Sequence, residues 1–124
     1  ADMLSRIRNA QLSKKPDVVI PYSKLKHNLA NIFVKEGYIE MAEKIDDAGK
    51  PVIKVTLKYV NNIGVIREIK RISKPGRRVY LNHKKLPYVL DNLGVAVIST
   101  SKGLMTNKEA RQKKLGGETL CEIY

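Results

Sequence analysis

The sequence predicts an α+β protein of two small subdomains: an N-terminal α/β unit over residues 1–62 and a mostly β unit with short helices over residues 63–124. Three observations predict this class. Apolar residues recur twice at helical spacing within the first half of the chain. Short runs typical of strands dominate the second half. A turn-prone stretch at residues 61–64 separates the halves, and each half is near the lower size limit for a core of its own.

The first half opens with a helix whose apolar face is made by four residues at helical spacing: Met3, Leu4, Ile7 and Ala10. Three polar side chains lie off that face: Arg6, Arg8 and Asn9. Residues 14–17 are expected to end the helix, because they combine two lysines with a proline and an aspartate. Residues 18–20 then form a short buried strand.

A second helix is predicted to begin after Ser23, a favourable N-cap, and to end before Gly37, which suits the C′ position. Its apolar stripe is made by Leu25, Leu29, Ile32 and Phe33. A hairpin follows, with strands over residues 38–45 and 51–59 joined by a turn over residues 46–50. These elements together predict a small α/β subdomain.

The second half is predicted to hold strands over residues 65–72 and 78–81, joined by a turn over residues 73–77. A short helix closed by Gly94 is indicated by four apolar residues: Leu86, Val89, Leu90 and Leu93. A strand over residues 95–98 comes next. Thr106 and Glu109 form a capping-box pattern, which predicts another short helix from about Asn107. Gly116–Gly117 are expected to reverse the chain before a final strand over residues 119–124.

The charge balance indicates a polyanionic partner. Lysine and arginine number 24 against 12 acidic residues, a formal net charge of +12. Nucleic acid is the first candidate and an anionic membrane surface the second. The membrane hypothesis is weaker because the sequence has no apolar run of spanning length and no basic helix with a strongly aromatic face. The first helix is charged and lacks the apolar core of a signal peptide, and a single cysteine fits a reducing cell interior.

A catalytic or metal-binding role is disfavoured. His27 is expected on a solvated helix face, His83 on the surface, and Cys121 in the core rather than as a nucleophile. Ser101, His83 and Asp91 could be drawn as a triad, but no nucleophile elbow surrounds the serine. One cysteine and two distant histidines do not supply a zinc site. We therefore expect no enzyme activity, no metal and no cofactor.

The stretch that best suggests a binding site follows the strand at residues 95–98. It contains three hydroxyl residues, a lysine and a glycine: Ser99, Thr100, Ser101, Lys102 and Gly103. Gly103 permits a tight turn, and hydroxyls at a strand end can both donate to and accept from a polar, structured partner. The alternative is that Ser99 and Thr100 only satisfy local backbone groups, as these residues often do in turns.

Cations gather at three further places. A Pro-Gly loop tip carries three of them: Lys74, Arg77 and Arg78. Lys84 and Lys85 stand near two rings that could pack on a sugar or base, those of Tyr80 and Tyr88. Arg6, Arg8 and Lys14 project from the first helix. A merely solvated basic surface is the alternative for any one of them. No DNA-binding motif is present and aromatic residues are few, so short hydroxyls beside cations favour the shallow minor groove of a folded RNA.

Several stretches carry a resemblance to a known family. Residues 98–111 place Ser-Thr before a glycine, two apolar residues and a later Ala-Arg pair. Residues 1–10, 71–80 and 116–118 match in the same order. The chain thereby resembles the family of the eighth protein of the small ribosomal subunit over nearly its whole length. Ser5 departs from the pattern, because threonine is usual there, and the chain begins a few residues later than family members do.

The resemblance implies a primary rRNA-binding protein that docks on the central domain of small-subunit RNA early in assembly. It implies that Ser99, Thr100 and Ser101 read an irregular RNA helix, and it adds Asn9, Gly117 and Glu118 to the RNA-binding set. Neighbouring small-subunit proteins, the fifth in particular, and the protein's own operon messenger are further implied partners. A cytoplasmic ribosome is expected, and an organellar one stays open. Two rival hypotheses also remain: a DNA-binding architectural protein and an RNA-modifying enzyme.

Overall fold

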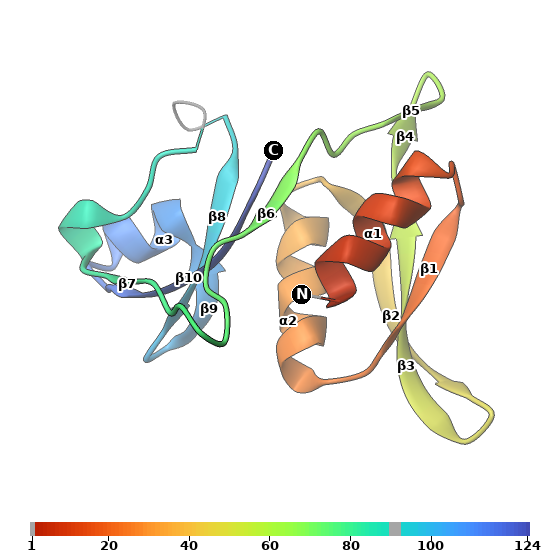
Figure 1. Cartoon of the computed structure of the whole chain (residues 1–124), viewed down its shortest axis with the longest axis horizontal. Coiled ribbons are helices and arrows are strands. Elements are labelled where there is room, and N and C mark those ends of the chain that lie inside the picture. Colours follow the sequence, from red (N-terminus) through yellow and green to blue (C-terminus); the bar gives the residue numbers. More distant parts are fainter. Residues whose placement is uncertain (1, 90–92) are drawn as a thin grey trace. The chain divides into compact units, whose positions relative to one another are not determined.

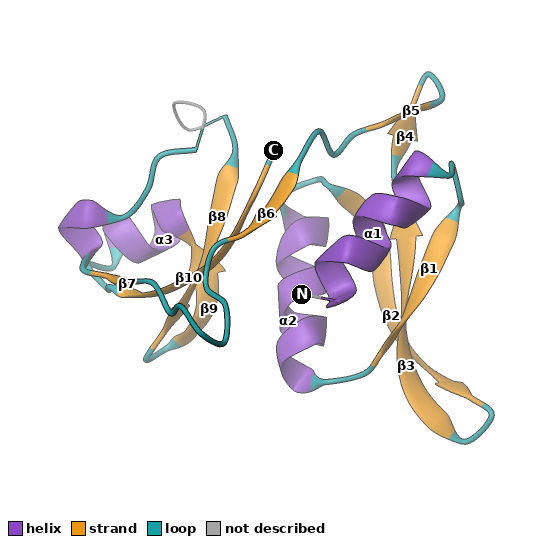
Figure 2. Cartoon of the chain, viewed as in Figure 1, coloured by secondary structure: helices purple, strands orange, loops and turns teal. Residues whose placement is uncertain are grey.

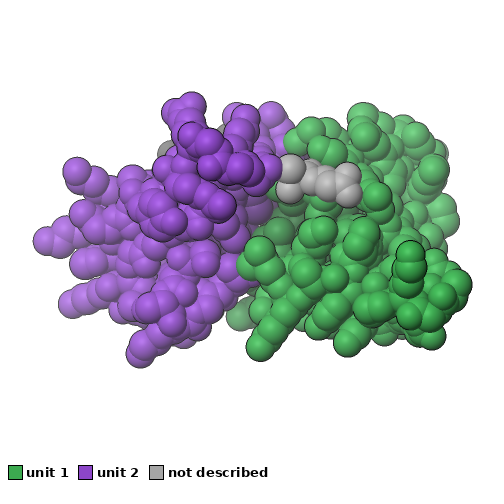
Figure 3. Space-filling view, turned by 60° about the horizontal axis from the view of Figure 1, so that its bottom comes forward, with its two compact units in different colours: residues 1–66 green, residues 67–124 purple. Residues whose placement is uncertain are grey.

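A computed structural model describes residues 2–89 and 93–124 of the chain (Figure 1). The chain divides into two compact units, residues 1–66 and residues 67–124, which Figure 3 colours separately. The division falls four residues after the border that the sequence suggested, because Ile66 is tied to the first helix. The Gln11 side-chain amide donates to the Ile66 carbonyl at 2.6 Å and its oxygen accepts from the Ile66 N–H at 3.3 Å.

The first unit has two layers, one of helices and one of β-strands. Its elements in chain order are α1 (Asp2–Leu12), β1 (Asp17–Pro21), α2 (Lys24–Lys35), β2 (Ile39–Asp47), β3 (Lys50–Leu57), β4 (Tyr59–Val60) and β5 (Ile63–Gly64). Strands β1, β3 and β2 form an antiparallel sheet in that spatial order, and β4 pairs with β5 in a separate small hairpin. Both helices lie over one face of the three-stranded sheet (Figures 1 and 2).

The core of this unit lies between the helices and that face of the sheet. Helix α1 contributes the four residues that the spacing predicted, all of them buried: Met3, Leu4, Ile7 and Ala10. Strand β3 alternates strictly, so that Ile53, Val55 and Leu57 are buried while the residues between them are half-exposed. Alternation of this kind is what a sheet covered on a single face requires.

The ends of α2 follow the predicted local signals. The Ser23 hydroxyl accepts from the Lys26 N–H at 3.1 Å, as an N-cap does, and Gly37 after the helix has a φ of +86°. One residue of the predicted stripe is misplaced: Leu25 is 53% exposed. Ala30 lies in the core instead, because the buried stripe of α2 is formed by Leu29, Ala30 and Phe33.

Two tight turns in this unit use left-handed backbone. Ala48 and Gly49 have φ values of +52° and +85° and close the long β2–β3 hairpin. Asn61 and Asn62 have φ values of +53° and +65° and close the β4–β5 hairpin, which the sequence suggested only as a turn-prone border. Two consecutive residues with positive φ are what a two-residue hairpin turn needs, and asparagine tolerates that conformation well.

The second unit is mostly β. It contains β6 (Ile69–Arg71), β7 (Tyr80–Leu81), a 3₁₀ turn η1 (His83–Lys85), β8 (Val95–Thr100), β9 (Gly103–Thr106), α3 (Asn107–Gln112) and β10 (Gly117–Ile123). The sheet order is β6-β10-β8-β9, and β7 also pairs with β10. All of these pairings are antiparallel. The α+β class and the contrast between the two halves of the chain are thereby confirmed.

Three predicted elements of this unit differ. The strand expected over residues 78–81 is shortened to β7, and the Val79 N–H donates to the Ser73 hydroxyl at 2.9 Å. The strand expected over residues 65–72 is reduced to β6, because the N–H groups of Arg67 and Glu68 donate to the Tyr124 carbonyl instead of entering a ladder. The helix expected from Leu86 is not formed over residues 86–89. Leu86 precedes Pro87, and its ψ of 143° is extended. Leu90 lies outside the described residues.

One core of the second unit packs α3 against the sheet. Six buried residues form it: Leu86, Val89, Ala96, Ile98, Met105 and Ala110. Asn107 is fully buried beside them, where its side chain accepts from the Ala96 N–H at 3.3 Å and donates to the Pro87 carbonyl at 2.9 Å. Thr106 is the N-cap of α3 as predicted: its hydroxyl accepts from the Glu109 N–H at 3.2 Å and donates to the Glu109 carboxylate at 3.4 Å. This packing positions the β8–β9 hairpin.

Candidate nucleic-acid interface

The hydroxyl-rich stretch forms the tip of the β8–β9 hairpin. Ser99 and Thr100 are the last residues of β8, and Thr100 pairs with Gly103 at the start of β9. Only Ser101 and Lys102 form the turn itself, because the strand predicted to end at residue 98 continues through Ser99 and Thr100. Gly103 has a φ of +106°, the conformation expected of it.

The hydroxyls of this hairpin differ in their hydrogen-bond partners. The Thr100 hydroxyl donates to the Gly103 carbonyl at 2.8 Å and accepts from the Lys102 N–H at 3.1 Å, so it closes the turn from within. This is the local role that the sequence left open. Ser101 is exposed at the tip, and no partner of its hydroxyl is found among the described residues. Ser101 is therefore the hydroxyl best placed to meet a partner from solvent.

Strand register places three predicted residues in one row. Glu118 on β10 is opposite Ser99 on β8 and also opposite Tyr80 on β7. Residues directly opposite in an antiparallel pair point to the same side of the sheet. The phenol, the carboxylate and the hydroxyl therefore share one face, although they are separated by up to 38 positions in the sequence. Tyr80 is 66% exposed, which leaves its ring accessible to a ligand.

Gly116 and Gly117 permit this close arrangement. A Cβ atom added to Gly117 would lie 2.2 Å from the Ser99 carbonyl oxygen, and one on Gly116 would lie 2.6 Å from the Leu81 carbonyl oxygen. The glycines thus allow backbone contact on both sides of β10, rather than the chain reversal that the sequence suggested. The reversal falls earlier, where Lys114 has a φ of +55°.

The loop of residues 73–78 carries the predicted cations on a narrow tip. Lys74 and Arg77 exchange two backbone hydrogen bonds of 2.9 and 2.8 Å around Pro75 and Gly76, and both side chains are exposed. Arg78 differs, because its guanidinium forms a 3.0 Å ion pair with Glu118. The positive charge of Arg78 is partly compensated, whereas Lys74 and Arg77 extend into solvent.

A further basic and aromatic group lies around η1. Lys84 and Lys85 are exposed on this turn, and the Asn82 side chain accepts from both of their N–H groups. Tyr88 is 63% exposed, and the Arg111 guanidinium lies 4.0 Å from the centre of its ring. Arg111 is fixed there by hydrogen bonds to the Leu86 and Pro87 carbonyls. One face of the Tyr88 ring is thus covered by a cation.

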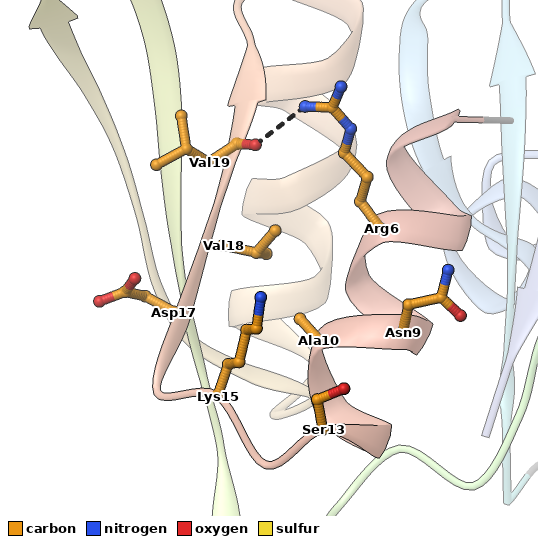
Figure 4. Close-up of a pocket in the computed structure, with 8 residues that line it drawn as sticks. All are labelled: Arg6, Asn9, Ala10, Ser13, Lys15, Asp17, Val18 and Val19. Atoms are coloured by element: carbon orange, nitrogen blue, oxygen red, sulfur yellow. Dashed lines mark hydrogen bonds between the residues drawn. The ribbon is translucent and has the colours of Figure 1, made fainter.

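The predicted residues of α1 lie apart in the sequence and belong to the first unit. A groove of about 490 Å³ lies between α1 and β1. Figure 4 shows the residues that line it: Arg6, Asn9, Ala10, Ser13, Lys15, Asp17, Val18 and Val19. The Arg6 guanidinium donates to the Val19 carbonyl at 3.1 Å. Arg8 is exposed on the same helix but does not line the groove.

Sequence reasoning overlooked two cations that the fold brings to these places. Arg111 was part of the noted motif but was not chosen, and its neighbour Tyr88 is 23 positions away. Lys15 lines the groove beside Arg6 because the chain turns back directly after α1. The basic doublet Lys14–Lys15 was a usable signal for the second residue. No local pattern indicated the first, since the Arg111–Tyr88 contact depends on the fold.

The Cys121 thiol belongs to the core of the second unit. Cys121 is 1% exposed, and burial raises the pKa of its thiol to about 12 from an ordinary 9.0, with the Glu122 carboxylate acting in the same direction. The thiol therefore stays protonated and is a core group, as predicted. Within residues 2–89 and 93–124, no three His, Cys, Asp or Glu side chains are grouped to hold a metal ion. No helix in that part is long and apolar enough to cross a membrane.

Comparison with known proteins identifies the family of this chain. The model of the family described as ribosomal protein S8 matches residues 1–124. The chain belongs to the ribosomal protein S8 family. Small ribosomal subunit protein uS8 of Caldanaerobacter subterraneus subsp. tengcongensis is 54% identical over 125 residues, covering all of this chain and 95% of that protein.

Other S8-family members match similarly. The small ribosomal subunit protein uS8 of Ruminiclostridium cellulolyticum is 55% identical over 124 residues, and that of Dictyoglomus turgidum is 48% identical over 124 residues. Each match covers the whole chain and 95% of the relative. The resemblance noted in the sequence is confirmed, and the S8 family is a family of ribosomal proteins rather than of enzymes.

Proposed function

We propose that this S8-family chain is a primary rRNA-binding protein of the small ribosomal subunit. Its second unit docks on an irregular helix of the central domain of the small-subunit RNA and helps the subunit to assemble. The observation that carries this proposal is the row of Tyr80, Glu118 and Ser99, with the exposed Ser101 at the adjoining hairpin tip. Short polar groups on a rigid sheet suit the wide, shallow minor groove of folded RNA.

Within this site we assign two roles. Ser99 and Ser101 read the RNA, because short neutral groups in a defined position can contact base edges and 2′-OH groups. Thr100 supports them through its hydrogen bonds within the turn. Lys74 and Arg77 position the RNA by contacting phosphates, because they are long, exposed and charged. Arg78 acts differently, since its ion pair with Glu118 orients that carboxylate in the row.

Other predicted contacts surround this centre. Lys84 and Lys85 add phosphate contacts near Tyr88, and Lys102 adds one at the hairpin tip. In the first unit, Arg6 and Asn9 line the α1–β1 groove and Arg8 is exposed close by, so we assign them peripheral RNA contacts. We further propose that the protein works in a cytoplasmic ribosome, that the fifth protein of the small subunit is a neighbour, and that the chain also binds a similar fold in its operon messenger.

Footprinting on naked small-subunit RNA tests the proposal directly. Protection of one discrete irregular helix of the central domain is the expected result. Diffuse protection along many helices would contradict specific recognition. Equal affinity for that helix and for DNA of matching sequence would support the rival architectural DNA-binding protein, because a 2′-OH contact distinguishes RNA from DNA.

A pair of variants separates reading from positioning. Ser101→Ala removes one hydroxyl without changing charge, so affinity for the specific hairpin should fall about tenfold, while affinity for a scrambled hairpin and the salt dependence stay unchanged. Arg77→Ala should weaken both hairpins alike and lower the slope of log K against log salt by about one. If Ser101→Ala weakens both hairpins equally, or neither, the hairpin tip does not read RNA.

A further inference from the structure

The face of the first unit's sheet that points away from α1 and α2 has an unusual composition. The registers of β1, β3 and β2 place nine residues on it in three full rows, and the row Asp47–Lys50 continues it at the end of the β2–β3 hairpin. The full rows are Asp17–Thr56–Met41, Val19–Lys54–Glu43 and Pro21–Val52–Ile45. Five of the nine are apolar, and three of these are well exposed, namely Val19 at 39%, Met41 at 47% and Ile45 at 36%. Apolar side chains gathered on an open sheet face indicate an interaction surface.

The charge of this face disfavours RNA as its partner. The chain as a whole carries +12, yet the residues of this face, with the end row Asp47–Lys50 included, hold three carboxylates and two cations, a net charge of −1. Lys54 forms an ion pair of 3.9 Å with Asp17 and stands opposite Glu43 in the ladder, and Lys50 stands opposite Asp47. Each cation of the face thus has a carboxylate beside it, and the Glu43 carboxylate would repel a phosphate. An RNA-binding protein has no electrostatic reason to place these side chains toward RNA.

We propose that this sheet face is a protein-docking surface for one basic, amphipathic segment of another protein. This docking proposal rests on the proposed function, because it requires the chain to be part of a ribosomal subunit. Apolar residues of the segment would pack on Val19, Met41 and Ile45, and a lysine or arginine of the segment would pair with Glu43. Proteins that share an RNA scaffold are themselves commonly basic, and Glu43 supplies the complementary charge.

The dimensions of the face suit a single element of secondary structure. From the usual strand spacing and rise, three strands and five residues along each cover about 10 Å by about 13 Å between Cα atoms. A helix with its side chains is about 10 Å wide. One helix laid on this face would complete a three-layer arrangement, with α1 and α2 on the other side of the sheet. Burial there would remove the exposed apolar side chains from water.

A cysteine-protection experiment tests the proposal with the full-length chain. Thr56→Cys and Val19→Cys each place a thiol on the face, and the native Cys121 is buried and supplies no background. Maleimide labelling is measured in the free chain, on naked small-subunit RNA and in the complete small subunit. The expected result is rapid labelling in the first two states and at least about tenfold slower labelling in the complete subunit. Ser101→Cys, by contrast, should be protected by naked RNA alone.

The outcomes distinguish this proposal from the proposed RNA site. Protection of both face cysteines by naked RNA would show an RNA surface and overturn the docking proposal. Rapid labelling in the complete subunit would also overturn the docking proposal, because it would show that no protein covers the face. Failure of RNA to protect Ser101→Cys would instead contradict the RNA site at the hairpin tip. The labelling of the two face cysteines would still decide the docking proposal on its own. A subunit in which both face cysteines are protected only after proteins are added supports docking.

A charge-reversal pair tests the basic character of the partner. Glu43→Lys should raise the labelling rate of Thr56→Cys in the complete subunit by about tenfold, because the partner's cation is repelled. Asp46→Lys is the matched control: it makes the same charge change on the same strand, but its register places it on the opposite side of the sheet. Equal effects of the two variants, or no effect of Glu43→Lys, would overturn the assignment of a basic partner.

Discussion

Replacing Gly117 by alanine probes the contact that holds β10 against β8 beside the hairpin. The added Cβ would lie 2.2 Å from the Ser99 carbonyl oxygen and 2.9 Å from the Ser99 carbonyl carbon. Both obstructing atoms belong to backbone, so no side chain can rotate away. Gly117 has no positive φ, so the perturbation is steric and not conformational.

The size of the effect follows from how far the strands must separate. An unstrained carbon–oxygen contact needs about 3.2 Å or more, so β10 must move by about 1 Å next to the Glu118–Ser99 pair. Forcing one methyl group into a packed position typically costs about 1–3 kcal/mol. For a chain of this size, we expect the melting temperature of Gly117→Ala to fall by roughly 4–12 °C.

Thermal unfolding followed by circular dichroism measures this shift, and Gly76→Ala is its control. Gly76 lies at the tip of the 73–78 loop, where an added Cβ meets nothing within 4 Å, so its replacement should change stability by less than about 0.5 kcal/mol. Equal melting temperatures for the two variants would refute the reasoning from close backbone packing. At temperatures where Gly117→Ala is folded, its specific RNA affinity should still fall, because the Ser99 carbonyl has moved.

Two other perturbations have defined outcomes. Asn107→Ala leaves the Ala96 N–H without its partner and removes one of two donors to the Pro87 carbonyl, which keeps its bond from Arg111. The free energy of unfolding, measured by urea titration, should fall by about 1–3 kcal/mol, and a loss below about 0.5 kcal/mol would contradict the role of this buried amide. Because the pKa of Cys121 is raised in the folded chain, the unfolded thiol ionises first as pH rises, so stability should decline between pH 9.0 and about 12. Cys121→Ala should show a shallower decline over that range, and parallel pH profiles would contradict the raised pKa.

Local signals in the sequence predicted the helices and their ends well. Ser23, Gly37 and Thr106 act within a few residues of their own positions, so their hydrogen bonds and backbone angles depend little on the rest of the fold. The missing helix at residue 86 was also predictable, because a residue before proline avoids the helical region. Apolar spacing favours a helix there, but the backbone restriction before Pro87 outweighs it.

The features that the sequence did not predict depend on contacts between residues far apart in the chain. Residues 65–68 resemble a strand, but two of their N–H groups bond to the last carbonyl of the chain, which no local pattern reveals. The same limit applies to the candidate site. Tyr80, Ser99 and Glu118 were each chosen, whereas their common row depends on the registers of three strands. The Arg78–Glu118 ion pair and the Arg111–Tyr88 contact arise in the same way.

The Thr100 hydroxyl affects how well the hairpin tip discriminates between related partners. By bonding to the Lys102 N–H within the turn and to the Gly103 carbonyl after it, this hydroxyl holds the hairpin tip in one conformation before any ligand arrives. A preordered tip loses little conformational entropy on association, so most of its contact energy remains available for affinity. A Thr100→Val variant would keep the exposed side chains of the tip, but its hairpin tip would adopt several conformations. Discrimination between related RNA helices would then decline before overall affinity does.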